Sequence, residues 1–164
     1  INLSSRQFSD PNLVEGIIEN IKESGFNAEC LKLEITESAL MQNAQRSVNM
    51  LNQLKNLHIK VCVDDFGTGY SSLSYLHTFP IDTLKIDRSF VHDMSRNYRN
   101  MEIIRTIIML AHNLKLDVIA EGVETAEQYA QLSALGCQFA QGFYFARPVN
   151  KDDATFLIRQ NQKW

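Results

Sequence analysis

Short apolar runs alternate along the chain with longer segments in which apolar residues recur every three or four positions. The short runs suit buried strands, and the longer segments suit amphipathic helices. We predict six strands, each bounded by polar residues, that end at Leu3, Ile35, Asp64, Ile86, Ala120 and Gly142. Strands that alternate with helices in this way are typical of βα units and a parallel sheet.

The predicted helices share a stripe of apolar residues. In the first, apolar residues recur every four positions over residues 13–21. We expect Asp10 to cap this helix, Pro11 to be its first residue and Gly25 to end it. Further helices are predicted around residues 48–54, 101–111, 126–135 and 152–160.

Six regular βα units make up most of a (β/α)₈ barrel, a fold that takes about 250 residues. The chain has 164 residues, so we predict an α/β protein with a partial TIM-type barrel that lacks about two units. A doubly wound open sheet is the rival fold, but its sites usually carry a glycine-rich phosphate turn after the first strand. Here the one GxG, formed by Gly67 and Gly69, follows the third strand and is weak evidence.

The composition is that of an ordinary globular domain, with 45% hydrophobic and 21% charged residues. The net charge is −3 and there is no basic run. We therefore expect no DNA binding and no nonspecific attraction to lipid headgroups. The three cysteines, Cys30, Cys62 and Cys137, show no CxxC spacing. We predict that they are reduced core residues of a cytoplasmic domain.

Polar residues at the predicted strand ends are the candidates for chemistry, because catalytic groups of a parallel barrel collect at the mouth lined by these ends. The candidates are Asn2, Glu34, Glu37, Asp64, Asp65, Lys85, Asp87, Glu121, Glu124 and Gln141. So many acidic groups at one rim would repel each other unless a cation held them together. Carboxylate and amide oxygens are the ligands that Mg²⁺ and Mn²⁺ prefer.

The sequence therefore predicts a metal site suited to phosphoryl chemistry. Asp64 and Asp65 could serve two ions that clamp the attacking and leaving oxygens of a phosphoryl displacement. Lys85 would add a cation beside the attacking water or a phosphate oxygen. A triad hydrolase is not indicated, because no serine or cysteine has an elbow motif or a histidine partner.

Each candidate also has a plain structural interpretation. Asp64 and Asp65 could cap the loop that follows them, and a single glutamate at a strand end often caps a helix. Lys85 alone resembles a surface lysine whose stem lies along apolar surface. These interpretations would have to hold independently at five successive strands, so the conjunction favours a site.

Six segments together carry a resemblance to a known family. They are residues 1–4 (INLS), 33–38 (LEITES), 63–73 (VDDFGTGYSSL), 85–87 (KID), 120–125 (AEGVET) and 141–145 (QGFYF). In order and spacing they resemble the EAL-type cyclic di-GMP phosphodiesterase domain over the whole chain. The resemblance implies a bacterial signalling enzyme with a barrel fold. Such an enzyme hydrolyses cyclic di-GMP to linear pGpG with Mg²⁺ or Mn²⁺, and we expect two ions.

The resemblance also implies a role for each motif residue. The implied metal ligands are Asn2, Glu34, Asp64, Asp65 and Glu121, with Asp64 bridging the ions. The implied catalytic residues are Asp64, Lys85, which contacts the attacking water, and Glu121, a candidate general base. Glu37 is implied to stabilise the loop after the third strand, and Gln141 and Asp87 to lie at the substrate.

That loop begins at Asp65, a proposed metal ligand, and contains Gly67 and Gly69. Glycine permits backbone conformations that are closed to other residues, so the loop could hold more than one conformation. We expect it to couple metal occupancy to dimer contacts or to an upstream sensor, with Glu37 holding the competent form. The alternative is a rigid turn that merely connects two elements.

The sequence departs from the family in one respect, because the Glu-Ala-Leu motif that supplies a further metal ligand does not occur in it. It also starts at Ile1 without an initiating methionine or signal peptide. We therefore expect residues 1–164 to be the C-terminal two-thirds of a single EAL domain, inactive alone but active within its parent. The expected parent is cytoplasmic or anchored through an upstream region, with a GGDEF or sensor domain, and a homodimer is a further expectation.

Two other functions stay open at this point. The first is a catalytically inactive EAL module that binds cyclic di-GMP as a receptor. The second, which rests on the fold alone, is another metal-assisted barrel enzyme that acts on a phosphorylated metabolite.

Overall fold

The computed structural model describes residues 1–69 and 73–160, and it contains one six-stranded sheet. The strands are β1 (Asn2–Leu3), β2 (Lys32–Thr36), β3 (Lys60–Phe66), β4 (Thr83–Ile86), β5 (Asp117–Glu121) and β6 (Phe139–Gln141). Their order in the sheet is their order in the chain, and every adjacent pair is parallel. A doubly wound sheet reverses its strand order at a switch point. The partial barrel is therefore confirmed, and the rival fold is wrong.

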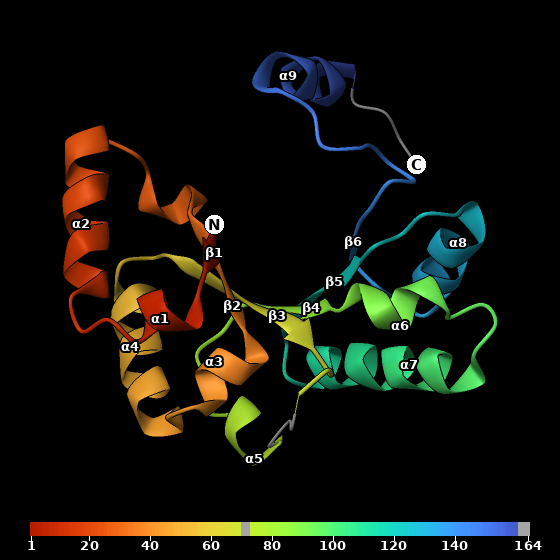
Figure 1. The fold of residues 1–164 in the computed structure, drawn as a ribbon, viewed down its shortest axis with the longest axis horizontal. Helices are drawn as coiled ribbons and strands as arrows, with labels where there is room; N and C mark the ends of the chain where they lie inside the picture. The colour runs from red at the N-terminus through yellow and green to blue at the C-terminus, as the bar shows by residue number, and fades with distance from the viewer. Residues whose placement is uncertain (70–72, 161–164) are drawn as a thin grey trace.

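Helices connect the strands and most of them cover one face of the sheet, but the last helix follows the last strand and stands apart from the sheet (Figure 1). They are α1 (Ser5–Phe8), α2 (Leu13–Ser24), α3 (Glu37–Met41), α4 (Ala44–Asn56), α5 (Leu73–Leu76), α6 (Arg88–His92), α7 (Tyr98–Asn113), α8 (Ala126–Ala134) and α9 (Lys151–Gln160), with a 3₁₀ turn, η1 (Ala28–Cys30). Figure 1 shows the strands as an arc with α4, α7 and α8 on its outer, convex side. Within the described ranges, no helix has the length and apolar character needed to cross a membrane.

The first long helix starts later than the sequence pattern predicts. α2 begins at Leu13 behind Asn12, so Pro11 is not its first residue and Asp10 is not its cap. Asp10 instead accepts a hydrogen bond from the backbone N–H of Asn12 at 2.9 Å, which forms a turn of its own before the helix. The predicted end is correct, because Gly25 closes α2 in the left-handed conformation that glycine adopts readily.

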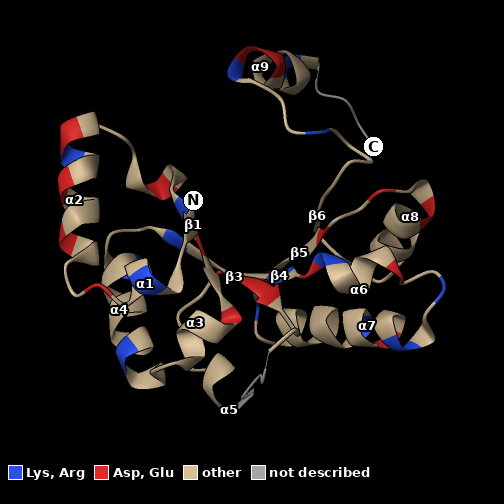
Figure 2. Ribbon diagram, viewed as in Figure 1, with Lys and Arg blue, Asp and Glu red and all other residues tan. Residues whose placement is uncertain are grey.

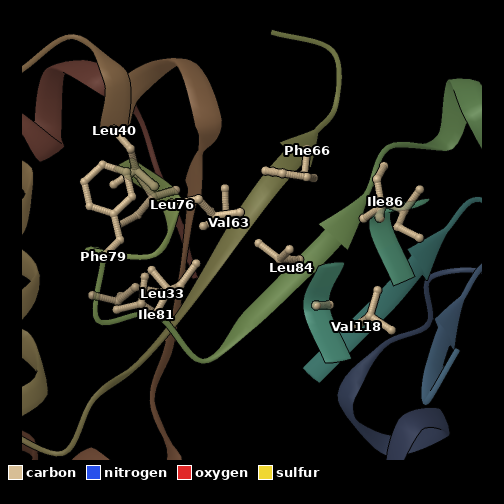
Figure 3. Close-up of a cluster of buried hydrophobic side chains, with 14 of the residues drawn as sticks. Leu33, Leu40, Val63, Phe66, Leu76, Phe79, Ile81, Leu84, Ile86 and Val118 are labelled. Carbon is tan, nitrogen blue, oxygen red and sulfur yellow. The ribbon is translucent and has the colours of Figure 1, made fainter. Parts of the chain in front are cut away.

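The alternation of side chains along the strands gives the sheet two different faces. The convex face carries apolar residues that are each at most 2% exposed: Leu33, Ile35, Val61, Val63, Leu84, Ile86, Val118 and Ala120. They belong to one core with helix residues such as Leu51, Leu54 and Ile104, and Figure 3 shows part of this core. Burying one such side chain stabilises a fold by about 1.5–3 kcal/mol, so this face holds the barrel segment together.

The cysteines differ in their surroundings. Cys62 is buried and Cys137 is partly buried, but Cys30 is exposed. The prediction that all three belong to the core is therefore wrong for Cys30. The reason is local, because Asn27 caps the 3₁₀ turn η1 and Cys30 is its last residue, two positions before β2 begins.

Candidate metal centre

Most of the polar residues predicted at the strand ends lie on the concave face of the arc; Glu37, Asp87 and Glu124 follow the strands and are described separately below. Register pairs Asn2 with Glu34 across β1 and β2, and Glu121 with Gln141 across β5 and β6. Paired residues of adjacent parallel strands share a face, and that face is opposite to their apolar neighbours in the chain. In Figure 2 acidic residues mark the carboxyl end of β3, in the middle of the arc.

Lys85 is the centre of this face. Its Nζ donates a hydrogen bond to Glu34 Oε2 at 3.0 Å and lies 3.4 Å from Asp64 Oδ1 and 3.8 Å from Glu121 Oε2. Burial alone would lower the pKa of Lys85. The hydrogen bond to Glu34 and the charges of Asp64 and Glu121 outweigh burial and raise that pKa above its ordinary value. Lys85 is 4% exposed, so the interpretation as a surface lysine is wrong.

Asp64 and Asp65 both reach this site because β3 contains a bulge. The register between β3 and β4 shifts between Val63 and Phe66, so these two aspartates together lie opposite Lys85. In a regular strand, consecutive side chains point to opposite faces, and a bulge re-aims one of them. Asp65 adopts a φ of 53°, in the left-handed region that aspartate tolerates better than most residues. Its N–H donates to Asp64 Oδ1 at 3.0 Å, which ties the turn together.

Asp64, Asp65 and Glu121 could hold a divalent cation. Each offers one carboxylate oxygen, these oxygens all lie within 4.8 Å of one another, and all three residues are partly buried. Burial and the charge of Asp64 raise the pKa of Asp65 and of Glu121. Since the ionised forms are disfavoured in this arrangement, a cation between them would relieve the repulsion. Hard oxygen donors of this kind suit Mg²⁺ or Mn²⁺.

Glu37 contacts the loop that follows β3. It is the first residue of α3 and is 2% exposed, and its Oε2 accepts a hydrogen bond from the N–H of Gly67 at 3.0 Å. Gly67 has a φ of 96°, and a Cβ there would lie 3.1 Å from Phe90 Cε2, so this position requires glycine. The loop-stabilising role of Glu37 stays a prediction, and residues 70–72 of the loop lie outside the described residues.

Asn2 and Gln141 lie at the two ends of the arc and are both exposed. The backbone of Gln141 is firmly held, because its carbonyl accepts hydrogen bonds from the N–H groups of Gly122 and Val123 at 2.8 and 3.1 Å. These bonds dock the end of β6 on the loop after Glu121. The roles predicted for the side chains of Asn2 and Gln141 stay predictions.

Asp87 has a local task that the sequence pattern did not indicate. It caps α6 by accepting a hydrogen bond from the N–H of Ser89 at 2.9 Å. Although burial acts in the opposite direction, the hydrogen bonds from Ser89 lower the pKa of Asp87, and a hydrogen bond with the Asp65 carboxyl group contributes to the lowering. Asp87 thus contacts a candidate metal ligand directly, while its predicted place at the substrate stays untested.

Glu124 is not brought to Lys85. It is exposed and lines a separate polar pocket together with His92. The buried residue of this region is Gln128, whose Oε1 accepts from the N–H of Glu124 at 2.8 Å and whose Nε2 donates to the carbonyl of Val91 at 3.1 Å. Gln128 therefore ties the loop after β5 to α6. Its signal in the sequence was the capping-box spacing from Thr125.

Known proteins resemble this chain in both sequence and fold. The EAL domain family model matches residues 1–148. The cyclic di-GMP phosphodiesterase NbdA of Pseudomonas aeruginosa is 42% identical over 149 residues, which cover 91% of this chain and 19% of NbdA. The chain spans about a fifth of the length of the curated relatives that it matches.

Two solved structures illustrate the structural similarity. The PaMucR phosphodiesterase in complex with c-di-GMP is 38% identical, with a TM-score of 0.91 over 93% of this chain and 62% of that one. The manganese and cy-diGMP complex of BlrP1 from Klebsiella pneumoniae is 31% identical. Its TM-score is 0.82 over 90% of this chain and 38% of that one.

Proposed function

Because the chain belongs to the EAL domain family, we propose that the protein that carries it hydrolyses cyclic di-GMP to linear pGpG and requires Mg²⁺ or Mn²⁺. One observation carries the proposal. Lys85 contacts carboxylates from β2, β3 and β5, and those from β3 and β5 also belong, with Asp65, to the acidic group whose oxygens could surround a cation. This is the arrangement that metal-assisted phosphoryl chemistry needs at a barrel mouth.

The metal-holding residues in this proposal are Asp64, Asp65 and Glu121, and Asn2 and Glu34 complete a site for two ions. Asp64 would be a central ligand of this set, because it belongs to the acidic cluster and its Oδ1 also lies 3.4 Å from Lys85 Nζ. When bound, the ions neutralise charge on the phosphodiester and lower the pKa of a coordinated water. The chain's own residues then have to orient that water and receive its proton.

Lys85 and Glu121 divide these tasks. The raised pKa of Lys85 keeps it protonated at neutral pH, so it acts as a hydrogen-bond donor that orients the water and stabilises developing negative charge. The Glu121 carboxylate lies beside Lys85 and Asp64 at the same mouth, so it is the proton acceptor for that water. As the water oxygen bonds to phosphorus, its proton passes to Glu121, one ester P–O bond breaks, and the released ester oxygen takes a proton from solvent to become the free hydroxyl of the linear dinucleotide.

The family resemblance described in the sequence analysis implies a wider setting for this activity. We propose that cyclic di-GMP reaches the site in the cytoplasm, that a GGDEF or sensor domain in the same protein regulates turnover, and that the protein works as a homodimer. Light scattering on the longest protein that carries this chain tests the dimer. A monomer at micromolar concentration contradicts it.

The activity is tested on the longest protein that carries this chain. Incubation with cyclic di-GMP and MgCl₂ or MnCl₂, followed by chromatography of the nucleotides, should yield pGpG, and EDTA should stop the reaction. Lys85→Met is the inactive control. If the wild type binds cyclic di-GMP but forms no pGpG, the receptor interpretation is favoured. If it neither binds cyclic di-GMP nor forms pGpG, both the enzyme and the receptor interpretations are contradicted.

A further inference from the structure

A second lysine lies on the concave face, one layer below the candidate metal centre. Strand register places Glu34, Cys62 and Thr83 in one layer across β2, β3 and β4, as in the stacked layers of barrel interiors. Lys32 lies two residues before Glu34 on β2, and its Nζ donates to Thr83 Oγ1 at 3.3 Å. The bond joins β2 to β4, which are not adjacent in the sheet because β3 lies between them.

This bond is the counterpart of the bond in the candidate site. Lys85 of β4 reaches Glu34 of β2 at 3.0 Å, whereas Lys32 of β2 reaches Thr83 of β4. The two lysines therefore cross the middle strand in opposite directions and end in the same layer. Cys62 occupies that layer on β3 and is completely buried.

The bond from Lys32 to Thr83 restrains the separation of β2 and β4, on which the contact between Lys85 and Glu34 depends. In a flat sheet, strands two apart are separated by about 9.5 Å. The hydrogen bonds of Lys32 and Lys85 both span β3 and so limit how far β2 and β4 can move apart. Thr83 is buried and needs a partner for its hydroxyl, which Lys32 provides. Thr83 lies two residues before Lys85, so any spreading of the strands at Thr83 also moves Lys85 away from Glu34.

We propose that Lys32 and Thr83 are positioning residues that hold Lys85 against Glu34 and so keep the acidic cluster in the shape that binds a divalent cation. Neither residue belongs to the motifs of the sequence analysis, since a lysine inside an apolar strand carries no signal until its partner on another strand is known. The effect on turnover rests on the proposed function. The effect on metal binding concerns only the chain's own residues.

The variants separate position from charge. Thr83→Val removes the hydroxyl but keeps the branched shape and leaves the charge of Lys32 in place. Thr83→Ser keeps the hydroxyl. Lys32→Met removes the donor, and Lys32→Arg keeps a cationic donor. Lys60→Met is the matched control, because Lys60 is paired in register with Lys32 but is exposed.

The experiment measures Mn²⁺ binding and steady-state kinetics with cyclic di-GMP in the longest protein that carries this chain. We expect Thr83→Val and Lys32→Met to weaken Mn²⁺ binding and lower kcat on the order of tenfold, as for outer-shell partners of metal sites. KM should stay within about twofold, and Thr83→Ser, Lys32→Arg and Lys60→Met should resemble the wild type.

Two results would overturn the proposal. One is unchanged Mn²⁺ binding in Thr83→Val, even with a lower melting temperature, because the bond would then serve the fold alone. The other is tighter Mn²⁺ binding in Lys32→Met, which is what loss of a nearby positive charge predicts without any positioning. If the wild type does not hydrolyse cyclic di-GMP, the proposed function fails, but the Mn²⁺ comparison still decides this inference.

Discussion

The two faces of the same sheet are built on different rules. Leu84 and Lys85 are neighbours on β4 and are both buried, at 0% and 4% exposure. Leu84 packs into the apolar core under the helices, whereas Lys85 is held by Glu34, Asp64 and Glu121 from three other strands. Leu84 is stabilised by burial alone, and Lys85 only by partners at the right distance.

This difference separates stability from activity. An apolar contact is non-directional and roughly proportional to buried area, so a change on the convex face costs stability in proportion to the atoms removed. On the concave face, each charged group depends on the others, and removal of one leaves buried charge without compensation. Substitutions on the two faces should therefore have different consequences, even at adjacent positions.

The largest expected effect is that of Lys85→Met on turnover. Because the lysine donates to the attacking water and stabilises developing negative charge in our proposal, kcat for cyclic di-GMP should fall by about 10²–10³, with KM changed only a few-fold. Steady-state kinetics measure both values. A raised KM with unchanged kcat would instead assign Lys85 to substrate anchoring.

The matching change on the convex face is Leu84→Ala. It should lower the free energy of unfolding by about 2–5 kcal/mol, because it leaves a cavity under the helices, while kcat of the folded protein stays near the wild-type value. Urea denaturation and kinetics at low temperature measure the two effects. Loss of turnover equal to that of Lys85→Met in folded Leu84→Ala would show that the faces are not separable.

The same contrast explains how much of the molecule the sequence predicts. The six strands and the long helices follow from apolar periodicity, because each convex residue carries its own signal. The helices α1, α3, α5 and α6 have only four or five residues, too few to show a helical period. Their existence depends on how the chain leaves the sheet.

The concave face was predictable in its residues but not in its geometry. Polar strand ends identified Asp64, Asp65 and Lys85. No local pattern predicts the bulge that places both aspartates opposite Lys85. No local pattern predicts the bond from Lys32 to Thr83. Both depend on which residues lie opposite each other in adjacent strands, and this is a property of the fold.

A smaller effect is expected from metal addition. If the acidic cluster binds Mn²⁺ only in the folded state, Mn²⁺ at a hundredfold excess over its Kd should stabilise the protein by about 2.7 kcal/mol. Thermal melts with and without Mn²⁺ measure this, and Asp65→Asn should lose most of the response. Asp93→Asn, a change at an exposed carboxylate, is the control, and an equal response in both variants would exclude the cluster as the site.

The smallest of these effects is expected at Glu37, which contacts the loop after β3. It is buried, and it holds the N–H of Gly67, two residues after Asp65. Glu37→Ala removes a charge-assisted hydrogen bond, so the loop should shift and weaken Mn²⁺ binding and kcat on the order of tenfold, as for other outer-shell partners.

The control for this change is Glu29→Ala, at an exposed glutamate in η1, which should leave both values unchanged. Melting temperature distinguishes the possible causes, because lower Mn²⁺ affinity in a protein that melts nearly as the wild type means that the loop geometry acts on the site directly. Unchanged Mn²⁺ affinity and kcat in Glu37→Ala would mean that the loop is a rigid turn. The left-handed backbone of Asp65 and the bulge would then be sufficient to hold the metal ligands, and the concave face would depend on its own strands alone.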